Sequence, residues 1–495
     1  MFEVAELKNR ITKQQYDREV SELRTQLLDV QQKLEIAGLP VVVLIAGVDG
    51  AGKGDLINTL NEWFDPRYMC THAFSQPSDE ERERPHHWRY WMSLPPRGRI
   101  GVYAIGWYGP PMADRVYDRI GNAKLDAELV HINKLEKELA DDGMLIVKCW
   151  LHLSKKQQEN LIQKLEKDPE TRWRVSDVDR KHLKLYKKFV GIAERVLRET
   201  STGEAPWLII NGYDQHYRRL TIANHLIERI SARLEAQSNG FSSTAALQQK
   251  PTLVNNGPSL LSSLNPELKL GKSDYQERLA LCQGRISQLT RRARQRKVST
   301  IMVFEGWDAA GKGGVIRRIT QALDARNYRV IPVAAPTDEE KSHHYLWRFW
   351  RHLPRDGKVT IYDRSWYGRV LVERVENLAK PEEWARAYSE INDFEEELTD
   401  HGIILVKYWM HISKDEQLKR FKEREKTSYK RYKITEEDHR NREKWDLYEA
   451  AVNEMITRTS TEYAPWRVIE ANNKYYGRIR VLKSLCDAYE SQLGG

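Results

Sequence analysis

The sequence predicts two tandem α/β domains, each with a parallel β-sheet that is covered by helices on both faces. The chain has 495 residues, and most single domains have roughly 100–250. The sequence also repeats itself at a fixed offset. Along each copy, short apolar runs typical of buried strands alternate with longer helical patterns, as in βαβ units.

The repeat is found by sliding the sequence along itself. Lys53 then aligns with Lys312, an offset of 312 − 53 = 259 residues. The same offset aligns the APW triplet at 205–207 with the APW triplet at 464–466. Because both copies keep nearly the same length, we interpret them as two structural units of one kind.

A linker is expected between the copies. Residues 236–263 are rich in Ser, Asn, Gln, Gly and Pro, and such a segment buries little apolar surface. We therefore expect one domain at 1–235 and a second at 264–495, each within the usual domain size.

The first strand of each copy is the clearest element. Residues 41–47 (VVVLIAG) and 300–306 (TIMVFEG) are apolar runs that end in glycine, typical of a buried parallel strand that enters a loop. A charged helix is expected before each of them, at 5–36 and 273–297. Further strands of the second copy are expected at 359–362, 403–409 and 466–469.

Composition and charge limit the function classes. Charged residues make up 31% of the chain, the mean hydropathy is −0.68, and no apolar run approaches the roughly 20 residues that span a bilayer. The amino terminus shows no secretory signal, so we expect a cytoplasmic protein with no membrane partner. The four cysteines show no paired metal spacing and are expected to be reduced.

A net charge of +9 and a pI near 9.1 favour a polyanionic partner, and a solvated basic surface explains them equally well.

A phosphate-binding loop follows the first strand of the second copy, in GWDAAGKGG at 306–314. Gly306, Gly311 and Lys312 satisfy the pattern G-x-x-x-x-G-K, in which backbone N–H groups and the lysine surround phosphates. Gly313 stands where a Ser or Thr hydroxyl commonly holds Mg²⁺, and Asp308 inside the loop is the alternative source of that oxygen.

The first copy reads GVDGAGKGD and keeps Asp49 and Lys53, so its loop is expected to be intact.

The octet YDRSWYGR at 362–369 follows a short expected strand. Asp363 stands where P-loop enzymes place the carboxylate that holds Mg²⁺, although a turn or cap is an equal explanation for an Asp alone. Arg364 beside it is placed to neutralise charge on a transferring phosphoryl group. The first copy has Ala104 and Ile105 at these two positions.

Two further segments carry charge or aromatic side chains. Lys426, Lys430, Arg431 and Lys433 stand where nucleoside monophosphate kinases have a mobile lid, and a solvated helix is the alternative. The aromatic run HHYLWRFWRHLP is expected to pack as an amphipathic helix, and its two histidines show no metal-ligand spacing.

Together, the segments GWDAAGKGG, SHHYLWRFWRHLP and YDRSWYGR resemble the polyphosphate kinase 2 family. The resemblance implies P-loop kinase domains akin to thymidylate kinase with a helical lid. It implies transfer of the terminal phosphoryl group of inorganic polyphosphate to a nucleoside mono- or diphosphate. The cofactor would be Mg²⁺, with Mn²⁺ as an alternative. Two fused copies resemble the members that convert AMP to ADP, and a homo-oligomer is left open.

Carried over by position, the resemblance assigns a catalytic role to Asp308, Lys312, Asp363 and Arg364, with the metal on the two aspartates. Gly306, Gly311, Gly313 and the lid cations would bind phosphates. Because the first copy lacks the second aspartate and the arginine, we expect it to be non-catalytic.

Three other functions fit parts of the pattern. The family's conversion of ADP to ATP depends on acceptor choice, which the sequence does not reveal. An ATP-dependent nucleoside monophosphate kinase would use the same loop and lid. A non-enzymatic nucleic-acid binder fits the charge, but we find no RNA- or DNA-binding module in the sequence.

Overall fold

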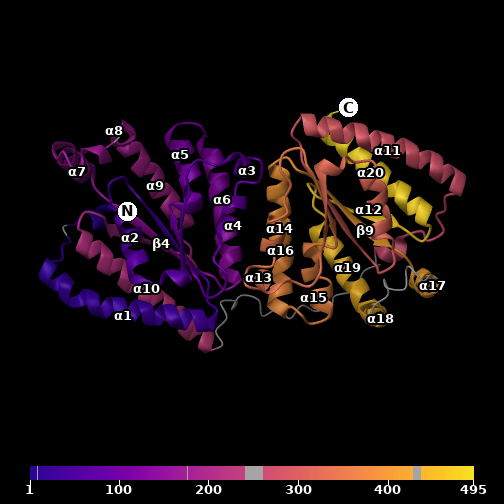
Figure 1. The fold of residues 1–495 in the computed structure, drawn as a ribbon, viewed down its shortest axis with the longest axis horizontal. Coiled ribbons are helices and arrows are strands. Elements are labelled where there is room, and N and C mark those ends of the chain that lie inside the picture. The colour runs from indigo at the N-terminus through magenta and orange to yellow at the C-terminus, as the bar shows by residue number, and fades with distance from the viewer. Residues whose placement is uncertain (8, 176, 240–259, 427–435, 495) are drawn as a thin grey trace. The chain divides into compact units, whose positions relative to one another are not determined.

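The structure is a computed structural model, and it describes the whole chain except residues 8, 176, 240–259, 427–435 and 495. The chain forms two compact units, each built around one five-stranded sheet (Figure 1). The first unit contains Met1–Pro77, Arg89–Ala246 and Lys341–His344, and the second contains Ser78–Trp88, Leu247–Glu340 and Tyr345–Gly495.

Both sheets are parallel and have the same topology. Their strand orders are β2-β3-β1-β4-β5 and β7-β8-β6-β9-β10. The first sheet consists of β1 (Val41–Gly47), β2 (Met69–Ala73), β3 (Ile100–Ala104), β4 (Leu145–His152) and β5 (Trp207–Asn211). The second sheet consists of β6 (Thr300–Gly306), β7 (Tyr328–Pro332), β8 (Val359–Asp363), β9 (Ile404–His411) and β10 (Trp466–Glu470).

Helices form two groups around each sheet, which confirms the α/β class with covered faces. In the first unit α1 (Lys13–Ala37), α2 (Lys53–Trp63) and α10 (Gln215–Ser238) pack together, and α5 (Gly109–Val116), α6 (Asn122–Asp141) and α9 (Tyr186–Thr200) form the other group. In the second unit the groups are α11 (Lys272–Gln295), α12 (Lys312–Thr320) and α20 (Lys474–Leu493), and α15 (Val372–Val375), α16 (Pro381–Asp400) and α19 (Trp445–Thr459).

Shorter helices connect these elements. They are α3 (Asp79–Arg82), α4 (Trp88–Ser93), α7 (Lys155–Lys167), α8 (Asp177–Lys184), α13 (Asp338–Lys341), α14 (Trp347–Trp350), α17 (Lys414–Glu425) and α18 (Glu436–Glu443). None of the helices in the described part of the chain has the length and apolar character needed to cross a bilayer.

The five expected strands are present, each within one or two residues of its predicted ends. The amino-terminal helix was predicted too long. Residues Glu3–Glu6 form a separate 3-10 turn, and α1 begins at Lys13 because the Thr12 hydroxyl accepts the Gln15 N–H at 3.2 Å and caps the helix.

The register of the central strands places the loops that carry function. In the second unit Phe304 of β6 lies opposite Asp363 of β8. The carboxyl ends of both strands therefore meet at one edge of the sheet, where ligands bind in open α/β folds.

Candidate active site

The glycine loop of the second unit has a backbone that requires its glycines. Gly306 has a φ of 144°, and a Cβ atom there would lie 2.4 Å from the Met410 carbonyl oxygen. Gly311 caps α12 with a φ of 109°. Lys312 begins α12, and its Nζ donates to the Gly306 carbonyl at 2.6 Å. The loop, the helix N-terminus and the lysine thus lie together, which is the arrangement that the predicted phosphate-binding role requires.

Asp308 lies within this loop and contacts residues from two other parts of the chain. Its Oδ1 lies 3.4 Å from Arg364 Nη2, and its Oδ2 accepts a hydrogen bond from Asn441 Nδ2 at 2.9 Å. The carboxylate is 15% exposed, whereas the Arg364 side chain is 42% exposed. The structure therefore brings two of the predicted site residues together, with the guanidinium more exposed than the carboxylate.

Asp363 and Arg364 form the turn that leaves β8. The Arg364 N–H donates to the Phe304 carbonyl at 3.0 Å, and Arg364 has a φ of 65°. A residue other than glycine in this region carries backbone strain of about 1–3 kcal/mol, and such strain concentrates at functional sites. The turn places the carboxylate and the guanidinium beside the end of β6.

A buried acid beside the loop was missed by sequence reasoning. Glu305 precedes Gly306 and accepts the Ser365 hydroxyl at 2.8 Å. Burial raises the pKa of Glu305, and the charges of Lys312 and Arg364 oppose that rise. A comparison of the two copies could have revealed this pair, because the first copy has Ala46 in place of Glu305 and Gly106 in place of Ser365.

A basic cavity of about 540 Å³ lies beside the glycine loop. Arg420, 3% exposed, donates to the carbonyls of Ala309 and Ala310 at 2.9 and 3.0 Å and to Ala471 at 2.6 Å, so it ties the loop to the end of β10. Burial lowers its pKa. The other cations that line the cavity are Arg424, Lys426, Lys474 and Arg478.

Of the predicted lid cations, Lys426 thus lies at the cavity. Lys430, Arg431 and Lys433 lie outside the described residues.

The acidic side chains at this edge suit a hard divalent cation. Asp363 is the last residue of β8 and Glu305 is the residue before the last in the neighbouring β6, and Asp308 lies in the loop that follows β6. Their carboxylate oxygens are the donors that Mg²⁺ prefers. The ligand atoms of these three carboxylates do not all lie within 4.8 Å of one another, so an ion held here would need further oxygen ligands, which the phosphates of a substrate supply.

The corresponding site of the first unit keeps the backbone and loses the side chains. Lys53 Nζ donates to the Gly47 carbonyl at 2.8 Å. The Ile105 N–H donates to the Ile45 carbonyl at 2.9 Å, with a φ of 71°. The two backbones differ at the next residue. Gly106 has a φ of 58°, whereas its counterpart Ser365 is extended with a φ of −157°.

The Trp-Tyr pair shared by both octets is structural. Trp366 and Tyr367 donate to Glu395 Oε1 at 3.0 and 2.7 Å, and Lys407 Nζ donates to Oε2 at 2.6 Å. Burial raises the pKa of Glu395 and lowers that of Lys407. The first unit repeats this network with Trp107, Tyr108, Glu136 and Lys148.

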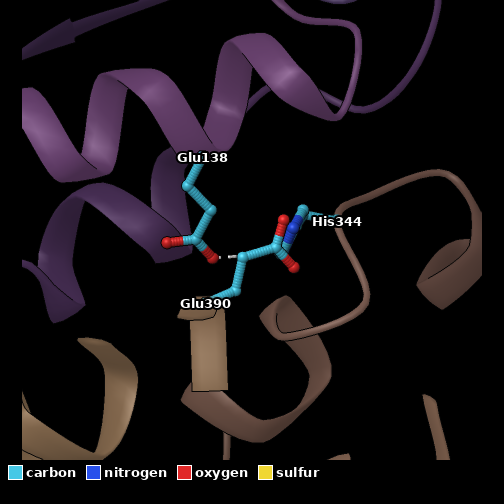
Figure 2. A group of neighbouring side chains, drawn as sticks. All are labelled: Glu138, His344 and Glu390. Carbon is cyan, nitrogen blue, oxygen red and sulfur yellow. Dashed lines mark ion pairs between the residues drawn. The ribbon is translucent and has the colours of Figure 1, made fainter. Parts of the chain in front are cut away.

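One histidine of the aromatic run has an acidic partner. Figure 2 shows the side chains of Glu138, His344 and Glu390. His344 Nδ1 lies 3.6 Å from Glu138 Oε1 within the first unit. Glu390, on α16 of the second unit, accepts from Arg386 Nε at 2.8 Å. The pairing of His344 joins two repeats, so spacing within one copy could not predict it.

The model of the family described as Polyphosphate kinase 2 matches residues 10–238 and again 269–493. The chain belongs to the polyphosphate kinase 2 family.

Relatives within this family cover the whole chain. A polyphosphate:AMP phosphotransferase of Pseudomonas aeruginosa is 50% identical over 99% of both chains, and one of Pseudomonas syringae pv. tomato is 48% identical over 99% of this chain and 98% of its own. A solved polyphosphate kinase 2 structure from Pseudomonas aeruginosa has a TM-score of 0.89 at 48% identity and covers 99% of both chains. The predicted family and fold class are confirmed.

Proposed function

We propose that this polyphosphate kinase 2 transfers the terminal phosphoryl group of inorganic polyphosphate to AMP and releases ADP. The observation that carries this conclusion is similarity over both units at once, because the relatives that match 99% of the chain are named polyphosphate:AMP phosphotransferases. A third such relative, from Acinetobacter johnsonii, is 36% identical over 90% of both chains.

We place the reaction in the second unit. Lys312 and the glycine loop would bind phosphate, and Arg364, close to Asp308 and half exposed, would face the group in transfer. In the first unit Ala104 and Ile105 provide neither a carboxylate nor a guanidinium at the equivalent positions. The first unit is therefore proposed to be non-catalytic.

Asp308 and Asp363 would hold the divalent ion, which we propose to be Mg²⁺. When bound, the ion would neutralise charge on the donor and acceptor phosphates, which otherwise repel each other. Glu305, buried and held by the Ser365 hydroxyl, is proposed to position the strand ends that carry these carboxylates.

The transfer needs no covalent enzyme intermediate. A phosphate oxygen of AMP attacks the terminal phosphorus of polyphosphate, the bond from that phosphorus to the next bridging oxygen breaks, and a shortened polyphosphate leaves. Lys312 holds the phosphate chain in place. Arg364 stabilises the charge that spreads over the equatorial oxygens of the transferred group.

The donor chain is proposed to enter along the basic cavity. Arg424, Lys426, Lys474 and Arg478 line it beside the glycine loop, and a linear polyanion binds such a row of cations with release of counterions.

The four cysteines are free thiols, which supports the cytoplasmic location expected from the sequence.

One assay tests donor, acceptor, direction and metal together. Purified protein is incubated with polyphosphate, AMP and Mg²⁺, and AMP, ADP and ATP are then resolved. We expect ADP from AMP, and no turnover in excess chelator. ATP formation from ADP alone would indicate the other direction, turnover with ATP but not polyphosphate would indicate a nucleoside monophosphate kinase, and full turnover in chelator would contradict the metal role.

A further inference from the structure

A cavity of about 160 Å³ lies in the first unit. In the alignment of the two copies, it corresponds to the proposed active site of the second unit. Its polar end is the glycine loop, with Asp49 and Lys53. Its other walls are apolar and come from the turn after β3 and from helices α5 and α9. They include Ile105, Met112, Val116, Leu185 and Phe189.

Several substitutions act together to make these walls apolar. At the offset of 259, Ala46 replaces Glu305 and Ile105 replaces Arg364. On the opposite side of the corresponding site, the second unit has an ion pair between Glu376 and Lys444 at 2.7 Å. The first unit has Tyr117 and Leu185 at those positions, and both line the cavity. The wall on the side of Ile105 is therefore more apolar than in the second unit, whereas His182, which pairs with Asp49 and contacts the Tyr117 hydroxyl at 2.7 Å, keeps the end near the glycine loop polar.

A buried polar atom in this cavity has no hydrogen-bond partner among the described residues. Gln158 is 3% exposed and lines the cavity. Its Nε2 donates to the Asp49 carbonyl at 3.0 Å, whereas its Oε1 is unsatisfied. In the second unit the equivalent Gln417 Oε1 accepts from Arg442 at 3.3 Å, and the first unit has Leu183 in place of that arginine. An unsatisfied buried acceptor is costly unless a ligand supplies the donor.

A second buried polar atom of the cavity, Trp150 Nε1, is also unsatisfied among the described residues. Trp150 is 1% exposed and lines the cavity. The equivalent Trp409 Nε1 is unsatisfied as well, so this donor does not distinguish the units. Together with Gln158 it gives the first unit's cavity one buried donor and one buried acceptor.

The backbone of Ile105 has a φ of 71°, an outlier for a β-branched residue, and the equivalent Arg364 has a φ of 65°. The turn shared by both units therefore determines where the side chain at this position lies. The side chain is 36% exposed and lines the cavity. An apolar side chain held at this position offers a contact surface to a ligand with an apolar part.

We propose that the first unit binds a nucleoside monophosphate without a metal ion and without chemistry. The base lies against the apolar wall, and the phosphate lies at the glycine loop near Lys53. A base also presents both ring acceptors and amino donors, which match Trp150 Nε1 and Gln158 Oε1. Polyphosphate has no apolar part and gains nothing from Ile105, Val116 or Phe189.

The cavity encloses only a ring. Its volume is below the roughly 300–1,000 Å³ of pockets that enclose drug-sized ligands, so ribose and phosphate lie toward its open, polar end. The choice of AMP as the nucleotide rests on the proposed function, whereas the site itself rests on the first unit alone.

The test is equilibrium dialysis of the full chain with labelled AMP in excess EDTA, which requires no turnover. Ile105→Asp replaces an apolar contact of the base with a charged side chain, and Ile105→Asn is the matched uncharged control. Both side chains tolerate positive φ better than isoleucine, and circular dichroism checks the fold. We expect Ile105→Asp to weaken one AMP site at least tenfold, Ile105→Asn to weaken it less, and Arg364→Ala in the second unit to leave it in place.

A second measurement keeps the proposal open to contradiction if these variants fold poorly. On the unsubstituted chain, inorganic phosphate should bind this AMP site with a dissociation constant, measured by competition, at least tenfold higher than that of AMP. Equal affinity for phosphate and AMP, AMP binding that depends on Mg²⁺ at every site, or unchanged binding by Ile105→Asp would overturn the proposal. Absence of phosphotransfer in the earlier assay would contradict the proposed function and leave this binding result unaffected.

Discussion

Arg364 and Ile105 occupy the same left-handed backbone position, with φ values of 65° and 71°. In each unit the residue's N–H donates to the carbonyl of the central strand, at Phe304 or at Ile45. Since backbone hydrogen bonds hold the turn in both cases, the chemistry of each unit is decided by the side chains that this turn presents.

Removing either charged group of the second unit should suppress the reaction. We expect Asp363→Asn and Arg364→Ala each to lower kcat at least about 10²-fold, the scale for loss of one preorganised charge. Steady-state kinetics with polyphosphate and AMP measures the effect. A loss below tenfold in a variant with an unchanged circular dichroism spectrum would remove that residue from the proposed site.

The buried pair of Lys407 and Glu395 predicts a stability effect. Both side chains are fully buried, so Glu395→Ala leaves an uncompensated charge and should cost about 3–5 kcal/mol of unfolding free energy. The exposed Asp400→Ala on the same helix should change it by about 0.5 kcal/mol or less. Urea unfolding of the two variants compares them, and equal midpoints would contradict this role.

His411 predicts a dependence of stability on pH. It accepts from Trp307 Nε1 at 3.3 Å, and burial lowers its pKa from 6.5 to about 4. Between these values the unfolded chain binds more protons than the folded chain, so this stabilisation is present above pH 6.5 and is lost as the pH falls toward 4. His411→Gln should flatten the fall in unfolding free energy between pH 7 and 5, and parallel curves would contradict it.

The sequence predicted side chains that belong to a motif and missed those that support it. Asp308, Lys312 and Arg364 stand at motif positions, and the structure brings them to one loop edge. Arg420 was not singled out, because in sequence it is one arginine in a mixed-charge helix. Its role depends on carbonyl groups more than 50 residues away, which no local pattern encodes.

In the second unit the sequence predicted β6, β8, β9 and β10 and missed the edge strand β7, whereas in the first unit only β1 was predicted. The central strand β1 is buried along its whole length, and its apolar run is unmistakable. The edge strands β2 and β7 have no buried residue, so their sequences MCTHA and YRVIP show no apolar run. Their strand pairing with β3 and β8 is a tertiary effect.

The lid segment predicts a coordinated loss of substrate binding. Neutralising Lys430, Arg431 and Lys433 together should raise the polyphosphate KM, lower kcat and reduce the slope of log KM against log salt concentration, because fewer counterions are released. Lys426 in the basic cavity provides a single-site comparison. If all three kinetic quantities stay unchanged, the segment is only a solvated surface.

For the whole molecule, matched substitutions in the two loops should have unequal effects. Lys312→Ala should lower kcat at least about 10²-fold, whereas Lys53→Ala should lower it less than about tenfold, since the first unit lacks the other charges of a phosphoryl-transfer site. Kinetics of both variants under identical conditions gives the comparison. Equal losses with the fold preserved would mean that the first unit takes part in catalysis.

The Gly106 backbone makes the divergence of the two copies hard to reverse. Aspartate and arginine could return at positions 104 and 105, because the turn there is unchanged. Serine could not return to position 106 without a shift, since φ is 58° and a Cβ would lie 2.4 Å from Leu44 Cδ2. Placing the second unit's residues in the first unit would therefore need a backbone adjustment at position 106 in addition to the substitutions at positions 104 and 105.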